Sequence, residues 1–264
     1  MRRTAVSAGL LLVAALPAHA QTGEPEGGAR RYRVAAGAQA VPSYPGADHN
    51  AVRPLFDFAS ARGSATFDYE AADESPNARL YDRDGLELGI AVGLQSARTA
   101  KRVGANLTKV GFTVEPGVFV GYYLAPALRA YGELRQGVNG HGGAVGFVGL
   151  DYVQRDGDRW LLAVGPRVKL SDAKYRRAYF VVSQRDATAV GIPVYRVGDN
   201  AVHSVGLAAT GLRQLTTHWG LYSYLAYDRL TGDAARSPVT QRLRSKNQFS
   251  GGLALSYTFG RGVR

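Results

Sequence analysis

Apolar and polar residues alternate along the chain between positions 112 and 136. The even positions are mostly apolar, whereas the odd positions include Glu115, Arg129, Glu133 and Arg135. Successive side chains of a β-strand point to opposite faces, so this alternation gives each strand one apolar and one charged face. It persists for roughly a dozen residues, twice, which is closer to the ~9–11 tilted residues that cross a bilayer than to a half-buried soluble strand of ~4–8. The pattern predicts membrane-spanning strands.

The same alternation recurs along the chain and predicts an all-β fold, a transmembrane antiparallel outer-membrane β-barrel of about 12 strands. The alternative is 10 strands, if the irregular region 64–82 forms one strand and a further pair merges. Short turns alternate with longer connections, as in bacterial barrels that keep both termini on the periplasmic side. The twelve predicted strands are 32–41, 52–61, 64–70, 78–82, 86–97, 112–124, 128–137, 143–154, 159–170, 202–213, 219–229 and 247–259.

The amino terminus predicts export. Arg2 and Arg3 precede an apolar stretch and the small-residue end Ala18-His19-Ala20, which indicates a signal peptide over residues 1–20. Residues 21–30 are rich in Gly and Glu without periodicity and are predicted to be disordered. Residues 31–264 then form a single barrel domain. The expected location is the bacterial outer membrane.

Composition narrows the possible partners. The chain has no cysteine, so no disulfide stabilises it, and its formal net charge is +11. Removal of residues 1–20 takes away two arginines and leaves 30 basic against 21 acidic residues, or +9. Nucleic acid is not expected as a partner of an exported chain. A basic exported surface fits outer-membrane lipid headgroups and lipopolysaccharide phosphates better.

The polar face of the predicted strands carries charges of both signs. We expect these side chains to face the barrel lumen, where opposite charges on neighbouring strands could pair and fill a narrow interior. The same charges could instead line a small aqueous pore and set its ion preference. The candidates are Glu115, Arg129, Glu133, Arg135, Arg167 and Lys169, together with Asp57, Glu87 and Asp151.

Two further groups of residues are candidates for contact with the membrane. Trp160, Trp219, Tyr257 and Phe259 lie near predicted strand ends and are expected in the aromatic girdle at the membrane interface. Basic residues gather in the predicted external loops, where guanidinium groups bind phosphate well. The candidates for contact with lipopolysaccharide there are Arg242, Arg244 and Lys246.

Catalytic, metal and cofactor sites are not predicted. The histidines that follow the signal peptide, at 49, 141, 203 and 218, are scattered, as are the serines at 43, 204 and 237. A nucleophile, a base and an orienting group must meet within hydrogen-bond reach, and no sequence spacing here indicates such a meeting. Asp48-His49 is the only neighbouring Asp-His pair, and thiolates are absent. The chain is therefore expected not to be an enzyme.

Several stretches resemble the MipA/OmpV family of outer-membrane proteins (the MltA-interacting protein family). They are VPSYPGADHN (41–50), ELRQGVNGHGG (133–143), AYFVVSQRDATAVGIPVY (178–195) and GDAARSPVTQRLRSKNQFSGGLALSYTF (232–259). The resemblance implies a non-catalytic barrel that acts as a structural scaffold for a lytic murein transglycosylase and a murein synthase in the cell envelope. A narrow diffusion channel for small solutes or drugs is the first alternative, and a membrane-embedded hydrolase is the second.

Overall fold

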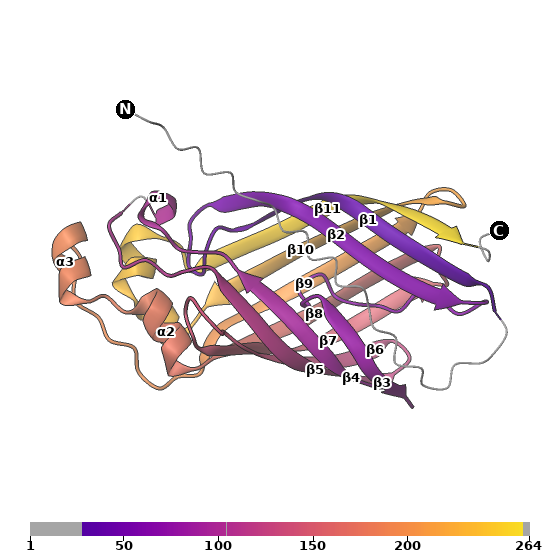
Figure 1. Cartoon of the computed structure of the whole chain (residues 1–264), viewed down its shortest axis with the longest axis horizontal. Helices are drawn as coiled ribbons and strands as arrows, with labels where there is room; N and C mark the ends of the chain where they lie inside the picture. The colour runs from indigo at the N-terminus through magenta and orange to yellow at the C-terminus, as the bar shows by residue number, and fades with distance from the viewer. Residues whose placement is uncertain (1–27, 104, 261–264) are drawn as a thin grey trace, which may run out of the picture.

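The computed structural model describes residues 28–103 and 105–260. Eleven antiparallel strands form one curled sheet in the order β2-β1-β11-β10-β9-β8-β7-β6-β5-β4-β3 (Figure 1). Strands that follow one another in sequence are neighbours throughout, except that β2 and β3 are the two ends of the sheet. The strands are β1 (Arg30–Pro42), β2 (Asn50–Arg62), β3 (Asn77–Arg83), β4 (Leu86–Gln95), β5 (Thr113–Ala125), β6 (Leu128–Gln136), β7 (Ala144–Asp156), β8 (Trp160–Ser171), β9 (Val202–Gln214), β10 (Trp219–Leu230) and β11 (Asn247–Gly260).

Short helices lie in the long connections at one end of the sheet (Figure 1). In the described part of the chain, none is long and apolar enough to span a membrane. The helices are α1 (Ala100–Val103), α2 (Ala173–Phe180), α3 (Gln184–Val190), α4 (Gly232–Arg236) and the π-helix η1 (Val239–Leu243). The predicted signal peptide and residues 21–27 lie outside the described residues, and β1 already begins at Arg30.

The alternation in the sequence sorts the side chains as predicted. Apolar side chains cover the outside of the sheet, and Leu94, Val118 and Leu162 are 62%, 58% and 56% exposed. Charged side chains of the opposite parity lie inside, where Arg129 and Asp151 are each 1% exposed. An apolar outside around a polar inside is the arrangement of a membrane barrel and the reverse of a water-soluble one. The predicted antiparallel barrel architecture is confirmed.

The predicted strand count is wrong by one, and the reason lies between β2 and β3. Residues 64–70 form no strand; the connection 63–76, here named the inner segment, runs along the inside of the sheet instead. Phe67 and Tyr69 alternate with Asp68 and Glu70, which mimics a strand in sequence. The two aromatic rings are buried inside the barrel, while Asp68 and Glu70 are exposed. The stretch 71–77, which the predicted strands 64–70 and 78–82 leave as a connection, belongs mostly to this inner segment.

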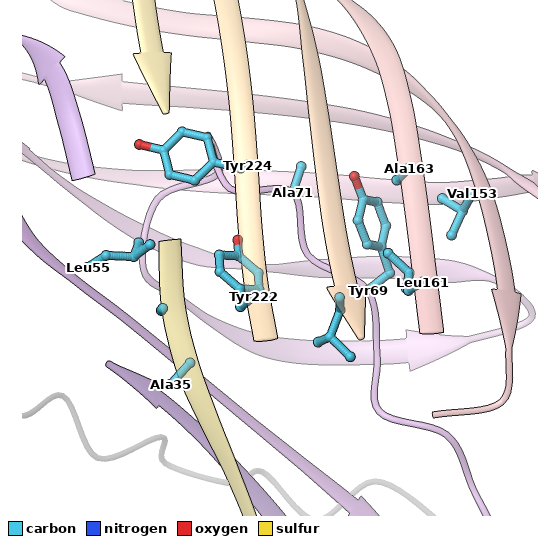
Figure 2. Close-up of a cluster of buried hydrophobic side chains, with 11 residues drawn as sticks. Ala35, Leu55, Tyr69, Ala71, Val153, Leu161, Ala163, Tyr222 and Tyr224 are labelled. Carbon is cyan, nitrogen blue, oxygen red and sulfur yellow. The ribbon is translucent and has the colours of Figure 1, made fainter. Parts of the chain in front are cut away.

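The inner segment packs against inward-facing apolar side chains from several strands. Figure 2 shows Tyr69 and Ala71 of the segment among Leu161 of β8 and Tyr222 and Tyr224 of β10. All of these side chains are at most 9% exposed. Burial of apolar area against the wall therefore helps to hold the segment in the lumen.

The long connections that carry the helices fold together over the mouth of the sheet. We name them the cap; they are the described residues of 43–49, 96–112, 137–143, 172–201 and 231–246. Two buried apolar clusters hold the cap together, one around Tyr44, Val182 and Val239 and one around Tyr179 and Phe180. Tyr179, Phe180 and Val182 are fully buried. Because bacterial barrels place long loops outside and short turns in the periplasm, the cap faces the exterior.

Candidate functional site

Arg129 of β6 is the centre of an ionic network inside the barrel. Its guanidinium group lies 2.5 Å from a carboxylate oxygen of Glu74 in the inner segment and 2.9 Å from one of Glu87 on β4. The three side chains are between 1% and 4% exposed. The ring of Tyr131 lies 4.8 Å from the same guanidinium group. Two carboxylates and an aromatic face thus surround one buried cation.

Arg167 of β8 repeats this arrangement. It donates hydrogen bonds to Asp73 of the inner segment at 2.8 and 3.1 Å and to Asp151 of β7 at 2.8 and 3.2 Å. One carboxylate therefore comes from the neighbouring strand and the other from the inner segment. Arg167 meets both of its carboxylates, and Arg129 meets Glu74, with bidentate geometry, which is the strong form of this pairing. Arg129 donates twice to one oxygen of Glu87.

A third cluster joins the inner segment to the base of the cap. Arg135 lies 2.8 Å from Glu115 and also pairs with Glu133. Ser75 of the inner segment donates to Glu133 at 2.8 Å. On its other side, Glu115 bonds the Nε2 atom of buried His141 at 2.8 Å. A continuous polar chain therefore runs from the inner segment to the cap.

The charged candidates predicted from sequence thus all lie inside the barrel, but their pairing is only partly between neighbouring strands. Lys169 bonds Asp228 on β10 at 2.6 Å, although β9 lies between the two strands. Arg33 and Asp57, on paired strands, stand 3.9 Å apart. The partners that sequence reasoning missed are Asp73, Glu74 and Ser75. Their only signal in the sequence was the loss of alternation after residue 70.

The cap has its own buried polar anchors. Asp186, near the start of α3, accepts hydrogen bonds from the backbone and hydroxyl group of Thr108 at 2.8 and 2.9 Å and from Ser183 at 2.9 Å. Burial alone would raise the pKa of Asp186, but the hydrogen bonds from Ser183 and Thr108 outweigh it and hold the pKa below its ordinary value. Arg98 donates to the backbone oxygens of Tyr179 and Thr108. These contacts tie the connections 96–112 and 172–201 into one unit.

The basic residues of the last connection have different surroundings. Arg242 is exposed on η1, and Lys246 is half-buried just before β11. Arg244 is engaged within the cap: it donates to the hydroxyl group of Tyr44 at 2.6 Å and lies 3.6 Å from Asp48. Of the three predicted contacts with lipopolysaccharide, Arg242 has the most accessible side chain.

The four predicted interface aromatics lie at the turn end of the barrel. Trp219 and Tyr257 are cross-strand partners on β10 and β11 with ring centroids 4.8 Å apart, and Phe259 follows at 6.3 Å from Tyr257. The three are 36–45% exposed on the outer face. Trp160 occupies the corresponding end of β8 and is half-buried. These rings form a partial girdle around that end.

One group of side chains has the connectivity of a hydrolytic triad. The Oγ atom of Ser43 lies 3.1 Å from Nε2 of His49, whose Nδ1 atom lies 2.9 Å from Asp48. Ser43 is, however, only 3% exposed, and its backbone N–H already donates to the backbone oxygen of His49. The arrangement therefore also closes the β1–β2 connection. Among the described residues, no three His, Asp or Glu side chains group as a metal site would require.

The apolar outer face, the charged and filled interior and the long loops gathered at one end define an outer-membrane β-barrel protein. A family model described as "MltA-interacting protein MipA" matches residues 34–259. The chain belongs to this family.

Solved structures with a likeness to the chain are distant. An outer membrane channel from Pseudomonas putida F1 is 11% identical over 90% of this chain and 100% of that chain, with a TM-score of 0.42. Neisserial surface protein A is 11% identical over 88% and 96%, with a TM-score of 0.26. The outer membrane protease OmpT from Escherichia coli is 11% identical over 88% and 97%, with a TM-score of 0.29. No curated protein matches the chain.

Proposed function

We propose that this protein is a non-catalytic structural barrel that serves as an outer-membrane scaffold for murein-cleaving and murein-synthesising enzymes. The observation that carries the proposal is the inner segment, whose Asp73 and Glu74 bind Arg167 and Arg129 in the lumen. A barrel that uses its interior charges to hold its own chain is built for rigidity rather than for passage of solutes. The narrow diffusion channel is correspondingly less favoured.

The description of the family supports the choice of partners. It names an interaction with MltA, and we take a lytic murein transglycosylase, together with a murein synthase, as the partner class of this chain. Such enzymes act on the periplasmic side, where the barrel offers its short turns. The surface around those turns is rich in charge, with Arg155 and Asp156 at the end of β7 and Asp158 and Arg159 in the β7–β8 connection.

Cross-linking in intact envelopes tests the scaffold. A photoreactive residue in place of Gly157, at the tip of the β7–β8 turn, should capture a murein enzyme. The matched control is the same residue in place of Gly191 in the cap, where a Cβ atom also meets open space. Equal capture at both sites, or capture at neither, would count against the proposal.

Recording of ion conductance in planar bilayers tests whether the inner segment closes the lumen. Wild-type protein should give no discrete conductance steps, whereas the double variant D73N/E74Q should give steps because it loosens the inner segment from Arg167 and Arg129. Steps in the wild type would favour the diffusion channel instead.

We also propose that the cap contacts lipopolysaccharide phosphates through Arg242 and Lys246. Arg244 would hold the connection 231–246 in position through its contacts with Tyr44 and Asp48. R242Q/K246Q should reduce the lipopolysaccharide that remains bound through detergent extraction, as read by its phosphate content. The matched control is R83Q, an exposed arginine at the turn end of β3. Unchanged retention in R242Q/K246Q would reject this contact.

The Ser43–His49–Asp48 chain favours one second candidate, a membrane-embedded hydrolase. In such an enzyme the Ser43 hydroxyl would attack an ester carbonyl while His49 takes its proton, and the alcohol of the ester would leave with that proton. Water, deprotonated by His49, would then release the acyl group from Ser43 as a carboxylic acid. A fluorophosphonate probe tests this directly. Labelling that is lost in both S43A and H49Q would establish a reactive serine. Absence of labelling in the folded wild type would leave the triad with its structural role alone.

A further inference from the structure

A groove of about 410 Å³ lies on the outside of the barrel at the turn end. It is lined by Asp156, Arg159, Trp160, Arg213, Gln214, Leu215 and Thr216. Asp156 and Arg213 are the cross-strand partners of Trp160 on β7 and β9, so the three side chains form one row on one face. The next row toward the centre of the sheet contains Leu162, which is 56% exposed. The row therefore lies where the apolar wall gives way to the polar turns.

The charges in this row are not balanced. Arg159 lies 3.4 Å from Asp156, in a pair in which both side chains are more than half exposed. Arg213 is exposed, and within the described residues its guanidinium group has no hydrogen bond or ion pair. Every strongly buried arginine of the interior, in contrast, has carboxylate or backbone partners. The guanidinium group of Arg213 is therefore available to bind a ligand from outside the chain.

The neighbouring surface suits a molecule with a polar head and an apolar tail. Trp160 stands beside Arg213, and Leu215 is 60% exposed at the rim of the groove. On the other side of Arg213, its partner on β10 is Leu221. An indole ring next to a guanidinium group is typical of the depth of lipid headgroups in a membrane interface.

We infer that this groove binds the phosphate of an anionic phospholipid in the periplasmic leaflet of the outer membrane. Arg213 and Arg159 supply the guanidinium donors, which match phosphate geometry, and Trp160 lies at the glycerol level. The acyl chains lie along the apolar wall below, beginning at Leu162. The lipid is assigned by charge and position, and the site is separate from the cap and its proposed lipopolysaccharide contacts at the opposite end.

Fluorescence of Trp160 tests the inference because the chain contains only two tryptophans. In a W219F background, Trp160 is the sole tryptophan in mixed micelles that contain a brominated phospholipid. Brominated phosphatidylglycerol should quench it at several-fold lower mole fraction than brominated phosphatidylcholine. R213Q should reduce this preference about fivefold, in line with the contribution of one arginine near an anionic surface. Equal quenching by the two lipids, or an unchanged preference in R213Q, would overturn the inference.

Matched variants separate this site from general attraction to anionic lipid. R229Q removes an outward arginine from the cap end of β10 and should leave the preference intact. D156N removes the groove's own carboxylate and should raise the preference. Folding of each variant is verified by its β-sheet circular dichroism. Inorganic phosphate without lipid should not change Trp160 emission. A loss of preference in R229Q equal to that in R213Q, or a full response to phosphate alone, would refute a phospholipid site.

Discussion

The inner segment and the cap both fill space at the barrel, but they are held by different forces. The inner segment is bound mainly by carboxylates: Asp73 and Glu74 meet arginines of the wall, and Ser75 adds a hydrogen bond to Glu133. The cap has an apolar core in which Tyr179 and Phe180 are fully buried. Polar anchors such as Asp186 only connect its parts.

This difference follows from where each region lies. The barrel wall turns most of its apolar side chains to the lipid. Beside the apolar cluster around Tyr222, its inward face carries charges that need partners because unpaired buried charge is costly. Any chain that fills the lumen must therefore bring opposite charge. The cap extends beyond the membrane into water, where clustering of apolar side chains stabilises a fold in the ordinary way. The same polypeptide thus uses two kinds of core.

The largest expected effect comes from removing a cation of the lumen. R129Q leaves the carboxylate of Glu74 without a guanidinium partner and leaves Glu87 with Arg79 alone, at 3.2 Å. We expect a loss of about 3–5 kcal/mol in the free energy of unfolding. Urea titration of the protein in lipid vesicles measures it. R83Q, which removes an exposed arginine at the turn end of β3, should cost less than about 1 kcal/mol. Similar costs for the two variants would mean that the interior charges do not stabilise the barrel.

A smaller and more local effect is expected in the cap. F180A removes a fully buried ring and should cost about 3 kcal/mol within the cap core. Phe180 lies in the apolar core of the cap, whereas the cap meets the lumen network at His141. Limited proteolysis should therefore cut the connections 172–201 and 231–246 faster while the urea midpoint of the sheet changes little. V194A, at a residue that is 48% exposed, is the matched control. Loss of sheet stability in step with cap cleavage would show that the two cores are coupled.

The smallest effect concerns pH. The pKa of Asp186 is lower in the folded protein than its ordinary value of about 4, so its stabilisation of the cap is present above that pH and is lost as the pH falls through the folded pKa. Hydrogen exchange in α3, corrected for intrinsic rates, should quicken by roughly fivefold between pH 5 and pH 2, as expected for about 1 kcal/mol. D186N should exchange quickly at both values. A wild-type rate that does not depend on pH would contradict the assigned hydrogen bonds.

The sequence predicted the strands of the barrel wall better than it predicted the inner segment and the cap. Alternation over residues such as Glu115, Arg129 and Arg167 placed these side chains on the inner face correctly, since strand geometry alone determines which face a side chain occupies. Residues 64–70 were predicted to be a strand because Phe67 and Tyr69 alternate with acidic residues. Alternation alone does not distinguish a strand of the barrel wall from an extended chain that lies inside the barrel. The partners Asp73 and Glu74 could not be assigned because they reach Arg167 and Arg129 across many residues of chain. The cap core was likewise invisible, since loops carry no periodicity.

The position of β2 and β3 at the two ends of the sheet has a consequence for chain connectivity. The first and last strands, β1 and β11, are paired with each other along most of their length, so they lie within the ladder rather than at its ends. A gene rearranged to start at β3, run through β11, continue into β1 and stop after β2 would encode a simple meander of nearest neighbours. In such a permuted chain the inner segment would be cut, and its two parts would become the new chain ends. The strands would then have to form the barrel without a lumen segment that is connected to both β2 and β3.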